Sequence, residues 1–405
     1  MKTYTGKQYL QIDIATHFGL DKELFPDRIK WVEDSEYELE NMEAEADDYF
    51  RYAAAVMAYH EAQAGIPSGH LVGMDACSSG PQILSVISGC KVGASNTGAT
   101  GQTRKDVYQI ERDTMSSLLG KELDYDKKIV KYSFMPHFYG SKAEPKKAFG
   151  EDTPELEAFY QATEIVCPGA SMLLPIMLGL WNPEAYEYRC DLPDGFQIIM
   201  KVKDTVDRKI EIDTIPGHPT FVYRHKVNEP MEEGLFIPAN VTQAIDAFIV
   251  RELTSRCAYN AVDIGIAEEL LIKRLNKSIS VPKAEYLYPE KMWHKHEFMS
   301  LVGIEFVNNW SVNQMSDDYC MYLLKLIRKV KSKKSFTVVC IHDEFKCLPN
   351  YMNHVRQCYI DILAELADSD ILNAILSDIA GREMNIDKLS NDLASEIRKS
   401  EYAVA

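Results

Sequence analysis

The sequence predicts an α+β fold in which a few short strands lie among many helices. Residues 71–74 and 336–341 are apolar or β-rich runs with the length of buried strands. A third run, residues 345–348, follows so closely that it predicts a hairpin with an acidic tip. Stretches with helical character surround these strands, at residues 20–65, 107–119, 154–165 and 351–369.

The composition limits the classes of function that the chain can serve. Hydrophobic residues make up 46% of the 405 residues and charged residues 26%, an ordinary globular balance. The net charge of −17 excludes a general nucleic-acid coat, but it allows a local basic channel. The N-terminus lacks a signal-peptide pattern, and no apolar stretch is long enough to span a bilayer. Nine cysteines without a C-x-x-C pair predict reduced thiols, so we expect a cytoplasmic protein without a membrane partner.

An aspartate follows each of the two main predicted strands. Asp75 ends the first strand, with small residues beyond it, and Asp343 lies at the hairpin tip. Two strand-end aspartates brought side by side make a site for two Mg²⁺ ions roughly 3.5–4 Å apart. The alternative is that Asp75 caps the following helix and that the acidic turn is simply solvated.

A third stretch lies between these two. Lys127 and Lys131 are four residues apart, so on a helix they share a face and can reach one polyphosphate. Tyr139 and a glycine follow at the predicted end of that helix, and Pro136 inside it predicts a kink. Alone, two lysines at this spacing are more typical of a solvated helix face than of a binding site.

The order of these stretches resembles that of a known family. A strand-end aspartate, then Lys-x3-Lys-x7-Tyr-Gly, then His-Asp is similar to motifs A, B and C of the single-subunit, bacteriophage-type RNA polymerases. The resemblance implies a right-hand fold with an antiparallel palm sheet and helical fingers. It covers most of the chain except about residues 252–334. Further segments that match in order are residues 25–33, 48–55, 106–108, 193–196 and 400–405.

The resemblance implies a role for each matched residue. The implied catalytic residues are Asp75, Lys131 and Asp343, and the implied ligands of two Mg²⁺ ions are Asp75, Asp343 and Ala76. The implied nucleotide-binding residues are Lys127, Tyr139, Gly80, Tyr108 and His342. The family usually has arginine where this chain has Lys127, and lysine lacks the bidentate fork of arginine.

One position separates RNA polymerases from their DNA-synthesising relatives. Gly80 stands where family A DNA polymerases carry a glutamate that blocks the ribose 2′-hydroxyl, and Tyr139 supplies a hydroxyl near the sugar. In contrast, the segment His342-Asp343-Glu344 resembles the DNA polymerase version of motif C. Because Gly80 has no side chain to clash with the 2′-hydroxyl, we expect ribonucleotides as substrates rather than deoxynucleotides. The alternatives are a family A-like DNA polymerase, a non-catalytic polymerase-fold subunit and a metal-dependent nuclease.

Two further regions carry weaker signals. Residues 186–202 and 209–227 alternate like strands, and a Pro-Gly turn lies in the second. The resemblance implies a promoter-contacting hairpin there; an ordinary charged surface hairpin fits equally well. Its candidate contacts are Arg208, Lys209, Arg224 and Lys226. Residues 91–105 are expected to form a loop, and residues 240–253 a helix along the product duplex with Arg251 as a phosphate contact.

We expect one catalytic domain over residues 1–405. Its expected parts are palm entry helices with motif A (1–105), fingers with motif B (106–190), a candidate specificity hairpin (191–235), a palm helix with an insertion (236–334), the motif C hairpin and helix (335–384) and a C-terminal foot (385–405).

The resemblance also implies partners. The N-terminal domain and the thumb of this family have no counterpart in the chain, so we expect the larger, catalytic subunit of a split, two-subunit phage RNA polymerase of the schitovirus type. The expected partners are a smaller subunit that carries the missing parts, the DNA template, the nascent RNA, nucleoside triphosphates and a single-stranded-DNA-binding or promoter-recruiting factor. The expected compartment is the cytoplasm of the host cell.

Overall fold

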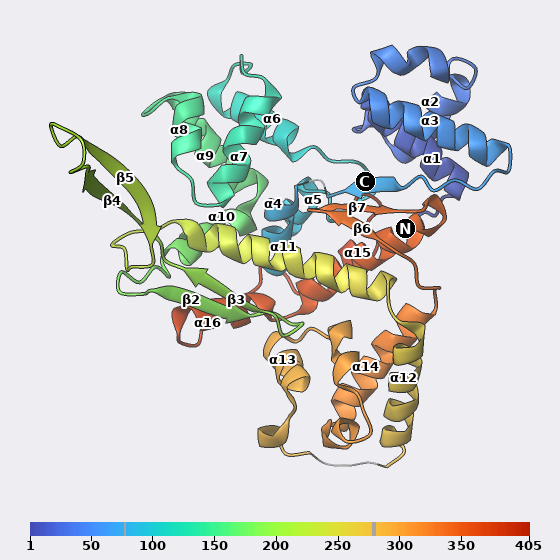
Figure 1. Cartoon of the computed structure of the whole chain (residues 1–405). Helices are drawn as coiled ribbons and strands as arrows, with labels where there is room; N and C mark the ends of the chain where they lie inside the picture. The colour runs from blue at the N-terminus through green and yellow to red at the C-terminus, as the bar shows by residue number, and fades with distance from the viewer. Residues whose placement is uncertain (77, 278–280) are drawn as a thin grey trace.

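The computed structural model describes residues 1–76, 78–277 and 281–405 (Figure 1). Many helices surround three small antiparallel sheets, so the expected α+β class is confirmed. No single helix among the described residues is long and apolar enough to cross a membrane. The helices α9 (Pro154–Val166) and α10 (Pro168–Leu178) have that length and composition only together, and they are bent by 109° where they meet.

A three-stranded sheet lies at the centre of the molecule. Its strands are β1 (Val72–Asp75), β7 (Glu344–Cys347) and β6 (Val339–Ile341), in the order β1-β7-β6 and antiparallel throughout. β6 begins three residues later than expected. The reason is that the N–H of Phe336 donates to the carbonyl of Cys257, 2.9 Å away, rather than joining the ladder.

Helices α4 (Ser79–Ile87), α11 (Phe236–Cys257) and α15 (Met352–Asp368) pack around this sheet and form the main core. The phenol of Tyr359 on α15 packs near Phe345 of β7 and donates to Gln82 Oε1 of α4 at 2.8 Å. The sheet is therefore fixed to helices that lie almost 300 residues apart in sequence.

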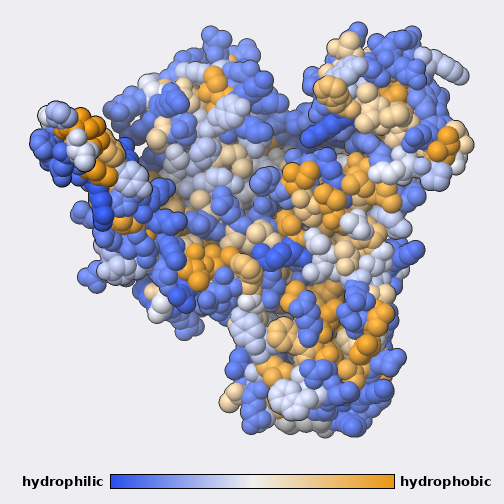
Figure 2. Space-filling model, in the orientation of Figure 1, coloured by the Kyte–Doolittle hydropathy of each residue, from blue (hydrophilic) through white to orange (hydrophobic). Residues whose placement is uncertain are grey.

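Two helical lobes stand on either side of the central sheet in Figure 1. The first holds α1 (Gly6–Ala15), η1 (Thr16–Leu20), α2 (Phe25–Asp34), η2 (Leu39–Glu45) and α3 (Tyr49–Gln63). The second holds α6 (Val107–Leu119), α7 (Lys127–Phe138), α8 (Ala143–Phe149) and α9, with α10 beneath them. Figure 2 shows the surface notched between the two lobes.

The expected loop at residues 91–105 is partly wrong, because α5 (Lys91–Asn96) occupies its first half. The Cys90 sulfur accepts a hydrogen bond from the N–H of Gly93 and so caps this short helix. Gly169 of α10 also donates to the same sulfur at 3.3 Å. Tertiary packing therefore stabilises a helix whose glycine content argues against it.

The two predicted strand regions form two hairpins. β2 (Glu187–Asp191) pairs with β3 (Gln197–Lys201), and β4 (Asp204–Glu211) pairs with β5 (Thr220–Val227). The β4–β5 hairpin projects from the body and is exposed almost throughout (Figure 1). Apolar residues gather on it (Figure 2), among them Ile210, Phe221, Val222 and Tyr223. Arg224 pairs across the hairpin with Asp207 at 2.8 Å.

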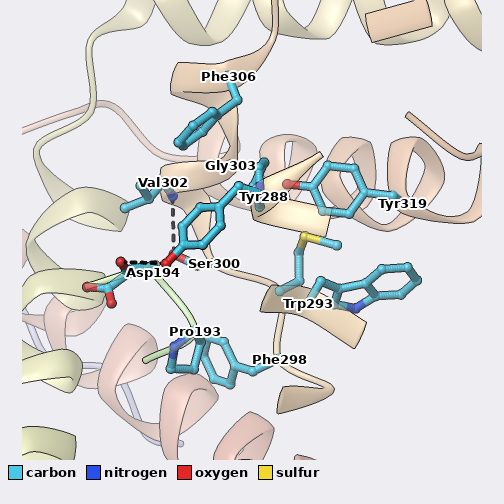
Figure 3. A pocket seen from close by; sticks show the side chains of 13 residues that line it. Pro193, Asp194, Tyr288, Trp293, Phe298, Ser300, Val302, Gly303, Phe306 and Tyr319 are labelled. Atoms are coloured by element: carbon cyan, nitrogen blue, oxygen red, sulfur yellow. Dashed lines mark hydrogen bonds between the residues drawn. The ribbon is translucent and has the colours of Figure 1, made fainter. Parts of the chain in front are cut away.

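The described residues between α11 and β6 form a separate small body with its own hydrophobic core. Its elements are α12 (Ala261–Leu275), η3 (Lys283–Glu285), α13 (Tyr288–His296), η4 (Leu301–Phe306), η5 (Ser311–Gln314) and α14 (Asp317–Lys331). Figure 3 shows a small pocket where this body meets the β2–β3 turn; the hydroxyl of Tyr288 donates there to the Gly195 carbonyl at 3.0 Å.

The chain ends beside the central sheet, after η6 (Pro349–Tyr351) and α15, α16 (Ile371–Ala380) and α17 (Leu393–Ile397). Tyr402 stacks on Phe25 of α2, with ring centroids 4.7 Å apart. Val404 forms a bridge with Ala76, and the N–H of Ala405 donates to the carbonyl of Asp75 at 2.9 Å. The C-terminal residues thus extend the edge of the sheet at the end of β1.

Candidate functional site

Asp75 and Asp343 lie next to each other at one end of the central sheet. Asp75 is the last residue of β1 and stands opposite Glu344, the first residue of β7. The N–H of Ala76 reaches the carbonyl of Asp343 at 3.4 Å. The resemblance to the polymerase motifs predicts this juxtaposition, and the antiparallel register produces it.

The turn that presents Asp343 is tight. Only His342 and Asp343 separate Ile341 of β6 from Glu344 of β7. His342 has a φ of 57°, which is uncommon for a residue with a side chain and is tolerated in two-residue hairpin turns. The turn thereby holds the Asp343 backbone against the end of β1.

A third carboxylate, Asp246 of α11, faces the same place. The charges of Asp343 and Asp75 both act on it. Sequence reasoning missed this residue, although a signal exists: Asp246 is an acidic side chain within a helical segment whose neighbours Ile245, Phe248 and Ile249 are buried. An acidic side chain beside the buried apolar face of a helix indicates a polar or charged partner on a neighbouring element.

Two of the carboxylates, Asp75 and Asp246, have a raised pKa. The Asp75 side chain reaches solvent, yet the surrounding protein and then the charges of Asp343 and Glu344 raise its pKa to about 6. Burial and then the charges of Asp343 and Asp75 also raise the pKa of Asp246 to about 6. A divalent cation would stabilise the ionised forms of Asp75 and Asp246 beside Asp343, and carboxylate oxygens are the ligands that Mg²⁺ prefers.

Arg104 is a second residue that sequence reasoning missed. Its positive charge lowers the pKa of Asp75, so it lies near the carboxylates. Two of its guanidinium nitrogens are buried and have no hydrogen-bond partner among the residues that the structure describes. Arginine forks suit phosphate and carboxylate groups. Its signal in the sequence is weak, because it lies in an irregular segment with no motif around it.

The helix α7 carries the predicted lysines as expected. Lys131 Nζ lies 5.5 Å from the centre of the Tyr108 ring, and the Tyr108 hydroxyl donates to Ser78 Oγ at 3.3 Å. Ser78 follows Asp75 by three residues, so Tyr108 links Lys131 to the segment after β1. Lys127 Nζ is held by Asp106 at 2.8 Å, and a phosphate bound there would have to compete with this ion pair.

Tyr139 and Gly80 form one unit. A Cβ atom at Gly80 would lie 3.0 Å from the Tyr139 hydroxyl, so the ring packs over the glycine. Burial and then the charges of Asp246 and Asp343 raise the pKa of Tyr139. The absence of a side chain at Gly80 therefore lets the Tyr139 phenol lie beside the carboxylates.

Pro136 lies in the last turn of α7, which continues as one helix to Phe138. The Pro136 carbonyl accepts hydrogen bonds from the N–H groups of Tyr139 and Ser141, at 3.1 and 2.9 Å. The proline therefore shapes the turn that presents Tyr139 and does not divide the helix.

A scan against protein-family models and a search of curated proteins find no match to this chain.

Proposed function

We propose that the chain is the catalytic subunit of a DNA-directed RNA polymerase that extends RNA by nucleotidyl transfer in phage transcription. One observation carries the proposal: Asp75 and Asp343 lie together at the end of antiparallel strands, and Tyr139, at the end of α7, lies near Asp343. Lys131 of the same helix lies over the Tyr108 ring. The order of these residues along the chain matches that of the polymerase motifs. In this proposal the β1-β7-β6 sheet is the palm and the α6–α9 lobe is the fingers.

The donor set fits a pair of hard divalent cations. Asp75 and Asp343 would hold two Mg²⁺ ions, with the backbone of Ala76 and the Asp246 carboxylate beside them. Bound Mg²⁺ would activate the 3′-hydroxyl of the growing strand and neutralise charge on the triphosphate.

The cationic residues of the site suit a triphosphate. Lys131 would pair with its phosphates and donate a proton to the departing pyrophosphate, and Lys127 would leave Asp106 to bind the outer phosphate. Arg104 adds a guanidinium with two unpartnered buried nitrogens. The Tyr139 hydroxyl, held over Gly80 and near Asp246, would contact the sugar of the incoming nucleotide.

Primer extension with labelled nucleotides tests the proposal. Asp75→Asn and Asp343→Asn should each remove nearly all elongation with Mg²⁺, while the exposed variant Asp34→Asn should keep wild-type activity. Circular dichroism verifies that the variants are folded. If either asparagine variant elongates at close to the wild-type rate, the metal assignment is wrong.

A DNA polymerase is the second candidate, because Glu344 lies directly opposite Asp75 and the His-Asp-Glu segment resembles the DNA polymerase motif. The same assay separates the two. Extension with deoxynucleotides alone would replace the RNA polymerase proposal with this one.

A further inference from the structure

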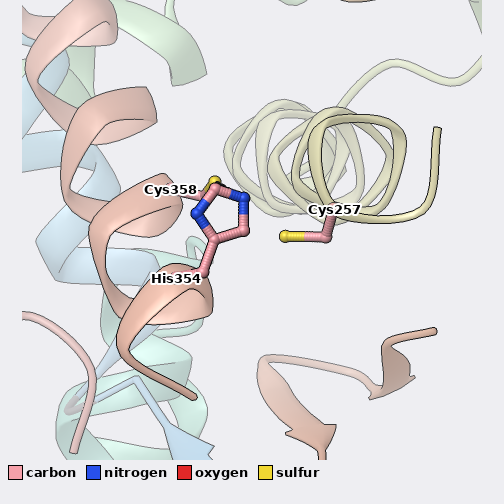
Figure 4. A group of neighbouring side chains, drawn as sticks. All are labelled: Cys257, His354 and Cys358. Carbon is pink, nitrogen blue, oxygen red and sulfur yellow. Dashed lines mark hydrogen bonds between the residues drawn. The ribbon is translucent and has the colours of Figure 1, made fainter. Parts of the chain in front are cut away.

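A group of soft metal ligands lies away from the carboxylate site, where α11 ends and α15 begins. It consists of Cys257, the last residue of α11, and His354 and Cys358 on α15. One ligand atom from each residue lies within 4.8 Å of those of the other two. Figure 4 shows the three side chains pointing toward one another from the two helices.

We propose that Cys257, His354 and Cys358 bind a thiophilic divalent cation of the zinc type, which fastens the base of the insertion to α15. Cysteine sulfur and histidine nitrogen are the usual ligands of such ions, whereas Mg²⁺ avoids them. The proposal is independent of the polymerase activity.

The spacing of the ligand atoms fits tetrahedral coordination. Zinc–sulfur and zinc–nitrogen bonds of about 2.3 and about 2.05 Å place the two ligand atoms about 3.6 Å apart at a tetrahedral angle. The distance between Cys358 Sγ and His354 Nε2 is 3.6 Å. A helix brings residues four apart onto one face, so α15 supplies this pair without strain.

The surroundings favour a bound metal. Both cysteines are buried and His354 is half-buried, and the His354 ring packs edge-on against Phe336, 5.6 Å away. A free thiol is present at each of the eight cysteines that the structure describes.

Cys340 of β6 is a candidate for the fourth ligand. Its sulfur lies 3.5 Å from the hydroxyl of Thr254, which precedes Cys257 by one turn of α11. Water would complete the tetrahedron if Cys340 does not turn inward.

The position of the site suggests what a metal would do there. The insertion leaves the main body after Cys257 and returns at Phe336, whose N–H donates to the Cys257 carbonyl at 2.9 Å. From Phe336 the chain enters β6 and the Asp343 turn. A metal that joins Cys257 to α15 would therefore fix both the insertion and the strand that leads to the carboxylates.

Cobalt substitution tests the site. The full-length protein is stripped with a chelator and titrated with Co²⁺ under reducing conditions, with excess Mg²⁺ to fill oxygen-ligand sites. One Co²⁺ per chain should bind and give a thiolate-to-cobalt charge-transfer band in the near ultraviolet. Zn²⁺ should displace it and raise the melting temperature.

Matched variants locate the binding. Cys257→Ser and Cys358→Ser should lose the band, whereas Cys320→Ser, a buried cysteine within the insertion, should keep it. His218→Ala removes a ligand of an exposed group formed by Glu211, Asp213 and His218 and should also keep it. The chelated variants should melt within a few degrees of the chelated wild type, which shows that they fold. Wild-type protein without the band, or a band that survives Cys358→Ser, would overturn the proposal.

Discussion

At the scale of the residue, the carboxylate cluster destabilises the folded protein and, at the same time, offers ligands to a cation. The pKa values of Asp75 and Asp246 are raised because the surrounding protein removes water from each carboxylate and neighbouring acids add negative charge. Ionisation of these two side chains costs more free energy in the folded protein than in the unfolded chain. Such a cost is typical of sites that are completed by a cation.

The pKa of Asp246 gives a prediction about stability. Its value rises from 3.8 to about 6, so the protein loses stability as the pH increases through that interval and stays at the lower level above it. Without metal at pH 8, Asp246→Asn should therefore raise the free energy of unfolding by about 1–2 kcal/mol, after allowance for solvent screening. The gain should disappear near pH 4. Denaturant unfolding in chelator measures it.

Added Mg²⁺ provides the control for this prediction. Wild-type protein should be stabilised by Mg²⁺ more than Asp246→Asn, because the variant has lost one of the repelling charges. If Mg²⁺ stabilises the two proteins equally, Asp246 does not interact with the bound cation.

Gly80 and Tyr139 give a prediction about sugar choice. Tyr139→Phe should raise the incorporation of deoxynucleotides with little loss of rate, because it removes only the hydroxyl. Gly80→Ala should have the same effect and slow elongation, because its Cβ would lie 3.0 Å from that hydroxyl. Competition assays with ribo- and deoxynucleotides measure both.

The exposed Tyr132 on the same helix supplies the matched control. Tyr132→Phe should leave the preference unchanged. If Tyr139→Phe discriminates between ribo- and deoxynucleotides as well as the wild type does, the Tyr139 hydroxyl has no part in sugar selection.

At the scale of the element, α6 holds a buried acid with no apparent role in the site. Glu111 is fully buried, and both of its carboxylate oxygens lack hydrogen-bond partners among the described residues. Burial alone raises its pKa well above 4.5. Packing of its apolar side chains therefore stabilises α6, whereas burial of the Glu111 carboxylate destabilises it.

Replacing Glu111 with Gln should stabilise the protein at neutral and alkaline pH. The wild type loses stability as the pH rises above 4.5, because the unfolded chain ionises this acid more easily than the folded protein does. The variant avoids that loss, which we expect to amount to about 1–3 kcal/mol at pH 8 and much less at pH 5. Thermal unfolding at both pH values measures the difference. A variant that is less stable than the wild type at pH 8 would show that the carboxylate has a partner.

At the scale of the whole molecule, the chain has a large negative net charge and exposes several large apolar side chains. A net charge of −17 disfavours lasting contact with phosphates. Large apolar side chains are exposed on the N-terminal lobe and just after it: Tyr37, Tyr49, Phe50, Met57 and Ile66. Exposed apolar groups of this kind often mark an interface.

The resemblance implies a smaller partner subunit, and we predict that such a subunit binds these exposed side chains of the N-terminal lobe. Phe50→Asp and Met57→Asp should reduce co-purification of the partner at least tenfold and leave the fold of the chain unchanged, because both side chains are exposed. The partner should also convert short, salt-sensitive extension into processive synthesis. Val262→Asp, exposed on α12, is the control. Processive synthesis by the chain alone would contradict the prediction.

The sequence by itself determined the elements that carry the predicted site, and the order of the chemical groups along the chain. The strand that ends at Asp75, the hairpin that presents Asp343 and the helix that carries Lys127 and Lys131 are each encoded within about a dozen residues. Local periodicity and turn composition suffice for such features, because the backbone responds to neighbouring residues. The α+β class follows from the same local signals.

Only the tertiary structure decided which side chains meet. Asp246 and Arg104 join the carboxylates, and Cys257 meets Cys358, through packing between elements far apart in sequence. The helix α5 likewise depends on a Cys90 contact with α10. The physical reason is that a helix or strand fixes the direction of its own side chains, whereas their partners depend on how the whole core packs.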